Sequence, residues 1–103
     1  MEYAKNEKQA ILRLIAEVIA EGEITNTGGF YLSLISIRLE VSDTDKLEAR
    51  NLSLQQSLNI LKQLCNDGKK GVKDFLEMVV TFEKSNSDSK AKKIKLLLSE
   101  INY

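Results

Sequence analysis

The chain has 103 residues, with 15 basic and 15 acidic side chains, no proline and no histidine. This length fits one domain that buries a core without a structural metal or disulfides. Ser-His-Asp and Cys-His catalysis and imidazole-bound zinc are excluded, because each of them needs histidine. The net charge of zero provides no overall field to attract nucleic acid or an acidic membrane.

The sequence also carries expectations about the compartment. The single cysteine, Cys65, cannot form a disulfide within the chain, and the first residues lack the basic and apolar segments of a signal peptide. No apolar run exceeds three residues, so no membrane span is predicted. We therefore expect a reduced, cytoplasmic protein, with Cys65 at the edge of its core.

The first predicted helix runs from about Glu7 to Glu21. Asn6 and Gln9 have the spacing of a capping box, and Gly22 is a candidate left-handed stop. Apolar residues within this segment repeat at intervals of three and four. This pattern predicts one buried face made of Ile11, Leu14, Ile15, Val18 and Ile19.

The stretch from Phe30 to Val41 is ambiguous, because its apolar residues partly alternate as they do in a strand. Leu32, Ile35 and Leu39 have helical spacing, however, and a single strand without a partner leaves its backbone hydrogen bonds unmade. We therefore expect a helix that is apolar nearly all round, of which a small domain covers only part. The uncovered part is expected to bind a protein partner or a second copy of the chain through Phe30, Tyr31, Leu34, Ile37 and Val41.

The remaining sequence predicts four more helical segments, which span about 44–50, 53–66, 70–83 and 88–102. Candidate N-caps stand before three of them, each with a partner three residues later: Ser42 with Asp45, Ser53 with Gln56, and Ser85 with Asp88. Gly68 and Gly71 are expected to form the turn that precedes the segment 70–83.

The two ends of the chain are similar to each other. A shift of 62 residues matches several apolar positions: Leu14 with Leu76, Val18 with Val80, Leu32 with Ile94, Ile35 with Leu97, and Leu39 with Ile101. Any two amphipathic hairpins can match in this way by chance, so that alternative stays open. We expect an all-α fold, a compact single domain over residues 1–103 with five to six helices and two pseudo-repeated helical hairpins.

The first hairpin has a distinctive turn. The segment from Ala16 to Thr25 reads Ala-Glu-Val-Ile-Ala-Glu-Gly-Glu-Ile-Thr, and Leu32, Ile35 and Leu39 follow it at helical spacing. This pattern resembles the tellurite-resistance TerB-like family, and a weaker second copy covers Phe82 to Ile101. The resemblance implies an all-helical, pseudo-twofold domain that serves stress-related or membrane-proximal assemblies and does not catalyse a reaction.

The same resemblance implies that two acidic turns approach each other and hold a divalent cation such as Ca²⁺, which prefers oxygen ligands. The candidate ligands are Glu21, Glu23, Glu83 and Asp88. Seven residues after Glu21 the family commonly carries another acid, but Gly28 stands there, and Lys90 stands seven residues after Glu83. We therefore expect weak or lost cation binding and no other cofactor, with these acids serving as solvent-exposed charges at helix ends.

Five lysines surround the last predicted helix: Lys84, Lys90, Lys92, Lys93 and Lys95. They form a candidate basic face for nucleic acid or an acidic protein. No aromatic residue lies among them to stack on bases, so nucleic acid is not the favoured partner. The leading expectation is a non-enzymatic interaction module, and a small helical regulator that acts through this basic face is the alternative.

Overall fold

The computed structural model describes residues 2–21, 26–82 and 87–103, and these residues are arranged as an all-α fold. The described ranges contain α1 (Lys5–Ala20), α2 (Asn26–Arg38), α3 (Asp43–Asn51), α4 (Leu54–Lys62), α5 (Asn66–Phe82) and α6 (Ser87–Glu100). The predicted all-α class with five to six helices is confirmed. The ambiguous segment from Phe30 to Val41 is helical as far as Arg38, as expected, and it turns out of the helix after that residue.

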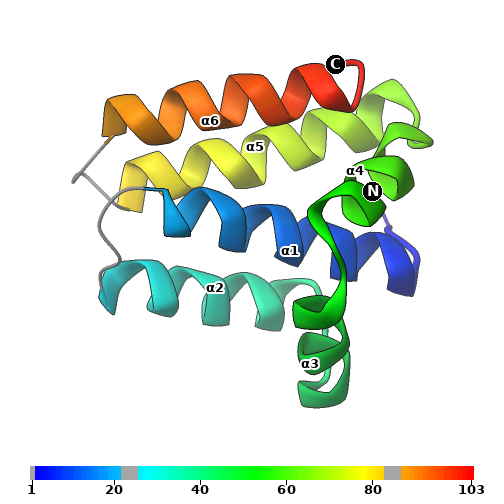
Figure 1. Cartoon of the computed structure of the whole chain (residues 1–103). Helices are drawn as coiled ribbons and strands as arrows, with labels where there is room; N and C mark the ends of the chain where they lie inside the picture. Colours follow the sequence, from blue (N-terminus) through cyan, green and yellow to red (C-terminus); the bar gives the residue numbers. More distant parts are fainter. Residues whose placement is uncertain (1, 22–25, 83–86) are drawn as a thin grey trace.

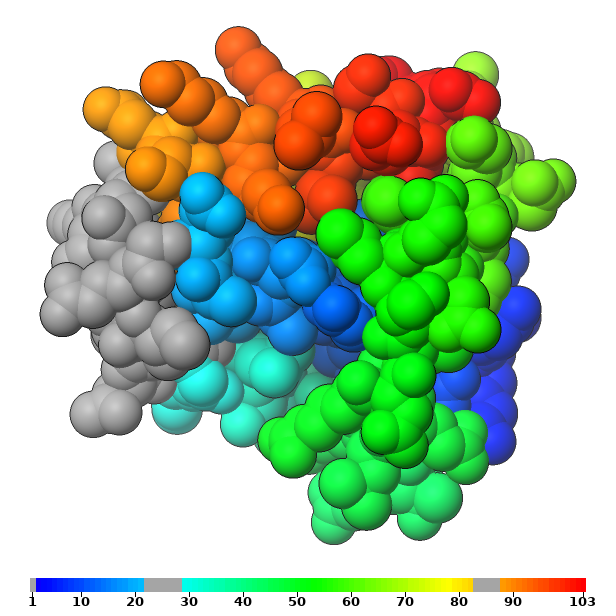
Figure 2. Space-filling model, viewed as in Figure 1, coloured from blue at the N-terminus to red at the C-terminus, as the bar shows by residue number. Residues whose placement is uncertain are grey.

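The helix at the centre of the fold is α1, which packs against each of the other five helices (Figure 1). Its whole predicted face is buried, and so are Ala10 and Leu12 on other sides of the helix. On the face seen in Figure 2, α1 lies between α6 on one side and α2 on the other, with α3 and α4 across one end. The hydrophobic core is therefore built around α1.

The helices form two hairpins, one made of α1 and α2 and the other of α5 and α6 (Figure 1). α1 lies against α5, and both of them contact α2 as well as α6. α2 and α6 lie on opposite sides of this central pair. The two hairpins thus occupy equivalent positions, and α3 and α4 connect them.

The ends of α2 and α6 show the internal repeat most directly. Glu40 and Asn102, which lie 62 positions apart, have φ angles of 57° and 62°. Equivalent N–H groups then reach back over the last turn of each helix: Val41 N–H to the Ser36 carbonyl at 2.9 Å, and Tyr103 N–H to the Leu98 carbonyl at 3.0 Å. Both helices therefore end in a Schellman motif, at positions related by the predicted shift.

Glu40→Gly is expected to raise the free energy of unfolding by about 0.5–1 kcal/mol, because a left-handed backbone is unfavourable for a residue with a Cβ atom. Asn102→Gly is the matched control, and its free energy of unfolding should rise by less, since asparagine tolerates the left-handed conformation. Urea unfolding followed by circular dichroism measures both changes. A lower midpoint for Glu40→Gly would contradict the prediction.

The helix N-termini agree only in part with the predicted caps. The predicted cap Asn6 lies inside α1, which begins earlier because the Glu7 carboxylate accepts a hydrogen bond from the Ala4 N–H at 2.7 Å. The caps Ser42 and Ser53 are confirmed, with hydrogen bonds from the backbone N–H groups three residues later at 3.1 and 3.0 Å. Gly22 and Ser85 lie outside the described residues.

The predicted turn at Gly68 and Gly71 is wrong, because both glycines lie within α5. The Tyr3 hydroxyl donates a hydrogen bond to the Gly68 carbonyl at 2.8 Å. A Cβ atom on Gly71 would collide with the same hydroxyl. The lack of a side chain at Gly71 therefore allows Tyr3 to pack closely on α5. Cys65, expected near the core, is exposed just before this helix.

Candidate protein-interaction surface

Large apolar side chains are exposed where α2 lies beside α5. On α2 the exposed fractions are 61% for Phe30, 39% for Leu34 and 74% for Ile37. On α5 they are 41% for Met78 and 38% for Phe82. Spacings of three and four residues place each set on one face of its helix. We call these five residues the apolar surface.

A groove of about 520 Å³ lies between the two helices, and we call it the α2–α5 groove. α2 and α5 run in opposite directions (Figure 1), so the start of one lies near the end of the other. Phe82 and Tyr31 line one end of the groove, whereas Arg38 and Asp74 line the other. The groove therefore has an apolar end and a charged end.

Tyr31 was predicted to be exposed for a partner, but only 1% of it is accessible. Its hydroxyl donates a hydrogen bond to the Phe75 carbonyl at 2.6 Å, and its ring meets that of Phe82 edge to face with centroids 5.0 Å apart. Tyr31 therefore ties α2 to α5 beneath the groove. Val41, from the same predicted set, is half-buried and packs against the core. Only Phe30, Leu34 and Ile37 of that set are exposed.

The free energy of unfolding is expected to fall between about pH 10 and pH 12, because burial raises the pKa of Tyr31 to about 12 from its ordinary 10.0. In this window the unfolded chain has lost the phenolic proton that the folded chain keeps, so raising the pH favours unfolding. Tyr31→Phe should show a smaller fall than the wild type, whereas exposed Tyr103→Phe should not. Denaturant unfolding near pH 9 and near pH 11 measures this, and equal falls for both variants would contradict it.

Met78 and Phe82 were not predicted as part of the surface. The buried stripe of their helix contains Val72, Leu76 and Val79. Met78 and Phe82 lie four residues apart and outside that stripe. Two large apolar residues at helical spacing outside a buried stripe are the signal that identifies them.

The predicted basic face is only partly exposed. Lys90 is fully buried, and its ammonium donates hydrogen bonds to the carbonyls of Ile19, at 3.2 Å, and Glu21. Lys93 is half-buried, with its ammonium 3.9 Å from the Glu17 carboxylate. Lys92 and Lys95 are exposed, and Lys84 lies outside the described residues. The prediction of an exposed Lys90 is wrong, because this ammonium bonds to carbonyls at the end of α1.

The four candidate metal ligands are not all described. Glu23 and Glu83 lie outside the described residues, so the approach of the two acidic turns stays a prediction. Asp88 is exposed, and Glu21 lines a shallow hollow with Lys92 and Lys93. Within residues 2–21, 26–82 and 87–103, no group of three acidic or cysteine side chains is placed to hold a metal ion. The lysines beside Glu21 would oppose a cation there.

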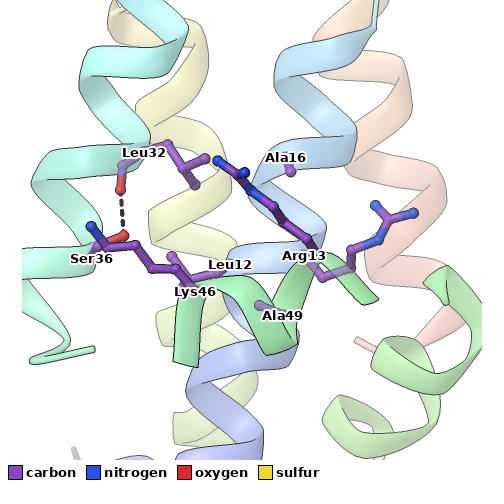
Figure 3. A pocket seen from close by; sticks show the side chains of 8 residues that line it. Leu12, Arg13, Ala16, Leu32, Ser36, Lys46 and Ala49 are labelled. Atoms are coloured by element: carbon purple, nitrogen blue, oxygen red, sulfur yellow. Dashed lines mark hydrogen bonds between the residues drawn. The ribbon is translucent and has the colours of Figure 1, made fainter. Parts of the chain in front are cut away.

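A second, smaller hollow of about 90 Å³ lies between α1, α2 and α3 (Figure 3). Its lining is mainly apolar, and it includes three cationic residues, Arg13, Lys46 and Arg50. Arg13 Nε donates a hydrogen bond to the Leu52 carbonyl at 3.0 Å, and its Nη1 lies 2.7 Å from the Glu17 carboxylate. Lys46 lies 3.5 Å from Asp43. Because this hollow is much smaller than the α2–α5 groove, and Arg13 and Lys46 already have partners, it is the weaker candidate site.

Comparison of the chain with protein-family models, with curated proteins and with solved structures finds no match. Among the described helices, none combines the length and apolar composition needed to cross a bilayer. The apolar surface and the α2–α5 groove are therefore the observations from which a function can be argued.

Proposed function

We propose that the protein is a non-enzymatic helical module that binds a protein chain through the α2–α5 groove. The observation that carries this proposal is the apolar surface, in which five large side chains from two adjacent helices are between 38% and 74% exposed. Single exposed apolar residues are ordinary, but a contiguous apolar patch usually marks a binding site.

The composition of the groove suits a protein partner. Met78 and Phe82, which line the groove, and Phe30 on the exposed face of α2 are of the types enriched at protein interfaces. Burying them supplies the driving force for association. Arg38 and Asp74 lie at one end of the groove, where charged groups can select the partner's orientation. Tyr31 fixes the two helices to each other, so the groove exists before a partner arrives.

The resemblance to the TerB-like family suggests the same class of function, since it implies a role in assemblies and no catalysis. The basic face was the alternative, but with Lys90 buried and Lys93 near Glu17 it presents fewer free cations than expected. The groove is therefore the better-supported binding surface.

Site-specific photo-crosslinking tests this proposal. The photoreactive residue p-benzoylphenylalanine is placed at Ile37 in the groove or at Leu96 on α6, which is 56% exposed and does not line the groove. Irradiation of cells that make the protein should yield a discrete protein adduct from position 37. The yield of any adduct from position 96 should be much lower. The comparison is valid because both positions are exposed and helical.

Adducts of equal yield from both positions, or none from position 37, would overturn the proposed binding surface. The mass of the adduct adds a second result. An increase of about 11.6 kDa indicates another copy of this chain, and any other increase indicates a different protein.

A further inference from the structure

We infer that the α2–α5 groove is filled by a second copy of this chain, related to the first by a twofold axis that runs along the groove. This inference rests on the proposed function, because it names the occupant of the same groove. It is drawn from the area of the apolar surface and from the charges at one end of the groove.

The apolar area suits a dimer of ordinary size. A large side chain presents roughly 200 Å² when fully exposed, so the five partly exposed residues offer on the order of 500 Å². A stable interface buries roughly 800 Å² on each partner, of which roughly 60% is apolar. The apolar surface alone therefore meets the apolar requirement of each partner.

The charged end of the groove is self-complementary. Among the described residues, Arg38 has no carboxylate within ion-pair distance, and Asp74 is paired only with exposed Lys70 at 3.6 Å. Arg38 comes from α2 and Asp74 from α5, and both line the same end. Arg38 and Asp74 therefore lie on opposite sides of the groove. When a second copy faces the first, the Arg38 guanidinium of each copy can pair with the Asp74 carboxylate of the other.

A twofold axis along the groove produces this match. Rotation about that axis places α2 of each copy over α5 of the other and keeps the charged ends together. Arg38 of one copy then faces Asp74 of the other, and the same pair forms again by symmetry. The apolar ends, which contain Phe82, also meet each other. Since α2 and α5 run in opposite directions, the facing helices of the two copies are antiparallel.

Sedimentation equilibrium of the purified chain from low micromolar to near-millimolar concentration tests the inference. The wild type should show a reversible monomer–dimer equilibrium, and Ile37→Asp should remove the dimer. Arg38→Asp or Asp74→Arg alone should weaken the dimer at least tenfold, because each places two pairs of like charges across the interface. The double variant Arg38→Asp with Asp74→Arg should recover most of the wild-type affinity. Leu96→Asp is the exposed control and should leave the dimer unchanged.

Circular dichroism of each variant separates loss of the dimer from loss of the fold. If Ile37→Asp does not fold, the charge variants at Arg38 and Asp74 provide the test. A monomer at every concentration, or a dimer unaffected by these changes, overturns the inference. A dimer that Ile37→Asp removes but the double variant does not restore overturns the proposed pairing and leaves the groove as the interface. If the chain is a monomer and position 37 crosslinks to another protein, the groove is not filled by a second copy, and the proposed function is supported.

Discussion

Leu14→Ala should lower the free energy of unfolding by about 3–4 kcal/mol, because Leu14 on the central helix α1 is completely buried. The loss combines the transfer of the removed methyl groups with the cavity that they leave. Leu76→Ala should cost a similar amount, since Leu76 has the equivalent position on α5 and is also fully buried. A small domain is stabilised by about 5–15 kcal/mol in total, so either change removes a large share.

The matched controls are a second repeat-related pair, Leu34 and Leu96, which are 39% and 56% exposed. In the monomer, at a concentration below that of the proposed dimer, Leu34→Ala and Leu96→Ala should each change the free energy of unfolding by less than about 1 kcal/mol. Urea unfolding followed by circular dichroism measures all four variants. If Leu14→Ala is severe and Leu76→Ala is mild, the two hairpins do not contribute equally to the core. In that case the two hairpins would share the arrangement of their helices but not the same contribution to stability.

Helix periodicity predicted much of this fold, because α1 has a strong apolar stripe and its whole stripe is buried. Glycine spacing was a poorer guide. Gly68 and Gly71 suggested a turn, but both lie within α5, and Gly71 leaves room for Tyr3, which comes from the N-terminal end of the chain. A contact between residues so far apart leaves no local pattern. For the same reason the helix α5 was expected to begin four residues too late.

The binding surface was harder to predict than the fold. α2 is apolar nearly all round, so its sequence does not indicate which side faces the core. Packing on α1 and α5 buries Tyr31, Ile35 and Leu39 and leaves Phe30 and Ile37 exposed. Which side of α2 is buried therefore depends on the neighbouring helices, and the spacing of apolar residues within α2 does not determine it.

The burial of Lys90 could have been predicted from its position in the sequence, but the lysines around it favoured a different interpretation. It lies four residues before Ile94 and seven before Leu97, on the buried stripe of α6. The surrounding lysines made a solvent-exposed charge the simpler interpretation. α1 has no basic residue in its last turn, and its final carbonyls carry partial negative charge. Lys90 supplies the missing cation from the other hairpin.

Lys90→Ala should lower the free energy of unfolding by about 3 kcal/mol, because it removes a buried stem together with charge-assisted hydrogen bonds to two carbonyls. Lys90→Met keeps a stem of similar shape and should cost about 1–2 kcal/mol, which isolates the contribution of the hydrogen bonds. Lys92→Ala, on the exposed side of the same helix, should change stability by less than about 0.5 kcal/mol. Urea unfolding of the three variants at neutral pH measures these differences.

The comparison between methionine and lysine at position 90 decides what the buried ammonium contributes. Burying a charge costs free energy, and replacing buried charges by apolar side chains is often neutral or stabilising. Here the ammonium has two backbone carbonyls and the negative end of α1, so we expect the interactions to exceed that cost. The equivalent position in the first half is Gly28, so only one hairpin can make this contact. If Lys90→Met is as stable as the wild type, the contact adds nothing to stability, and packing of the stem explains the burial of Lys90.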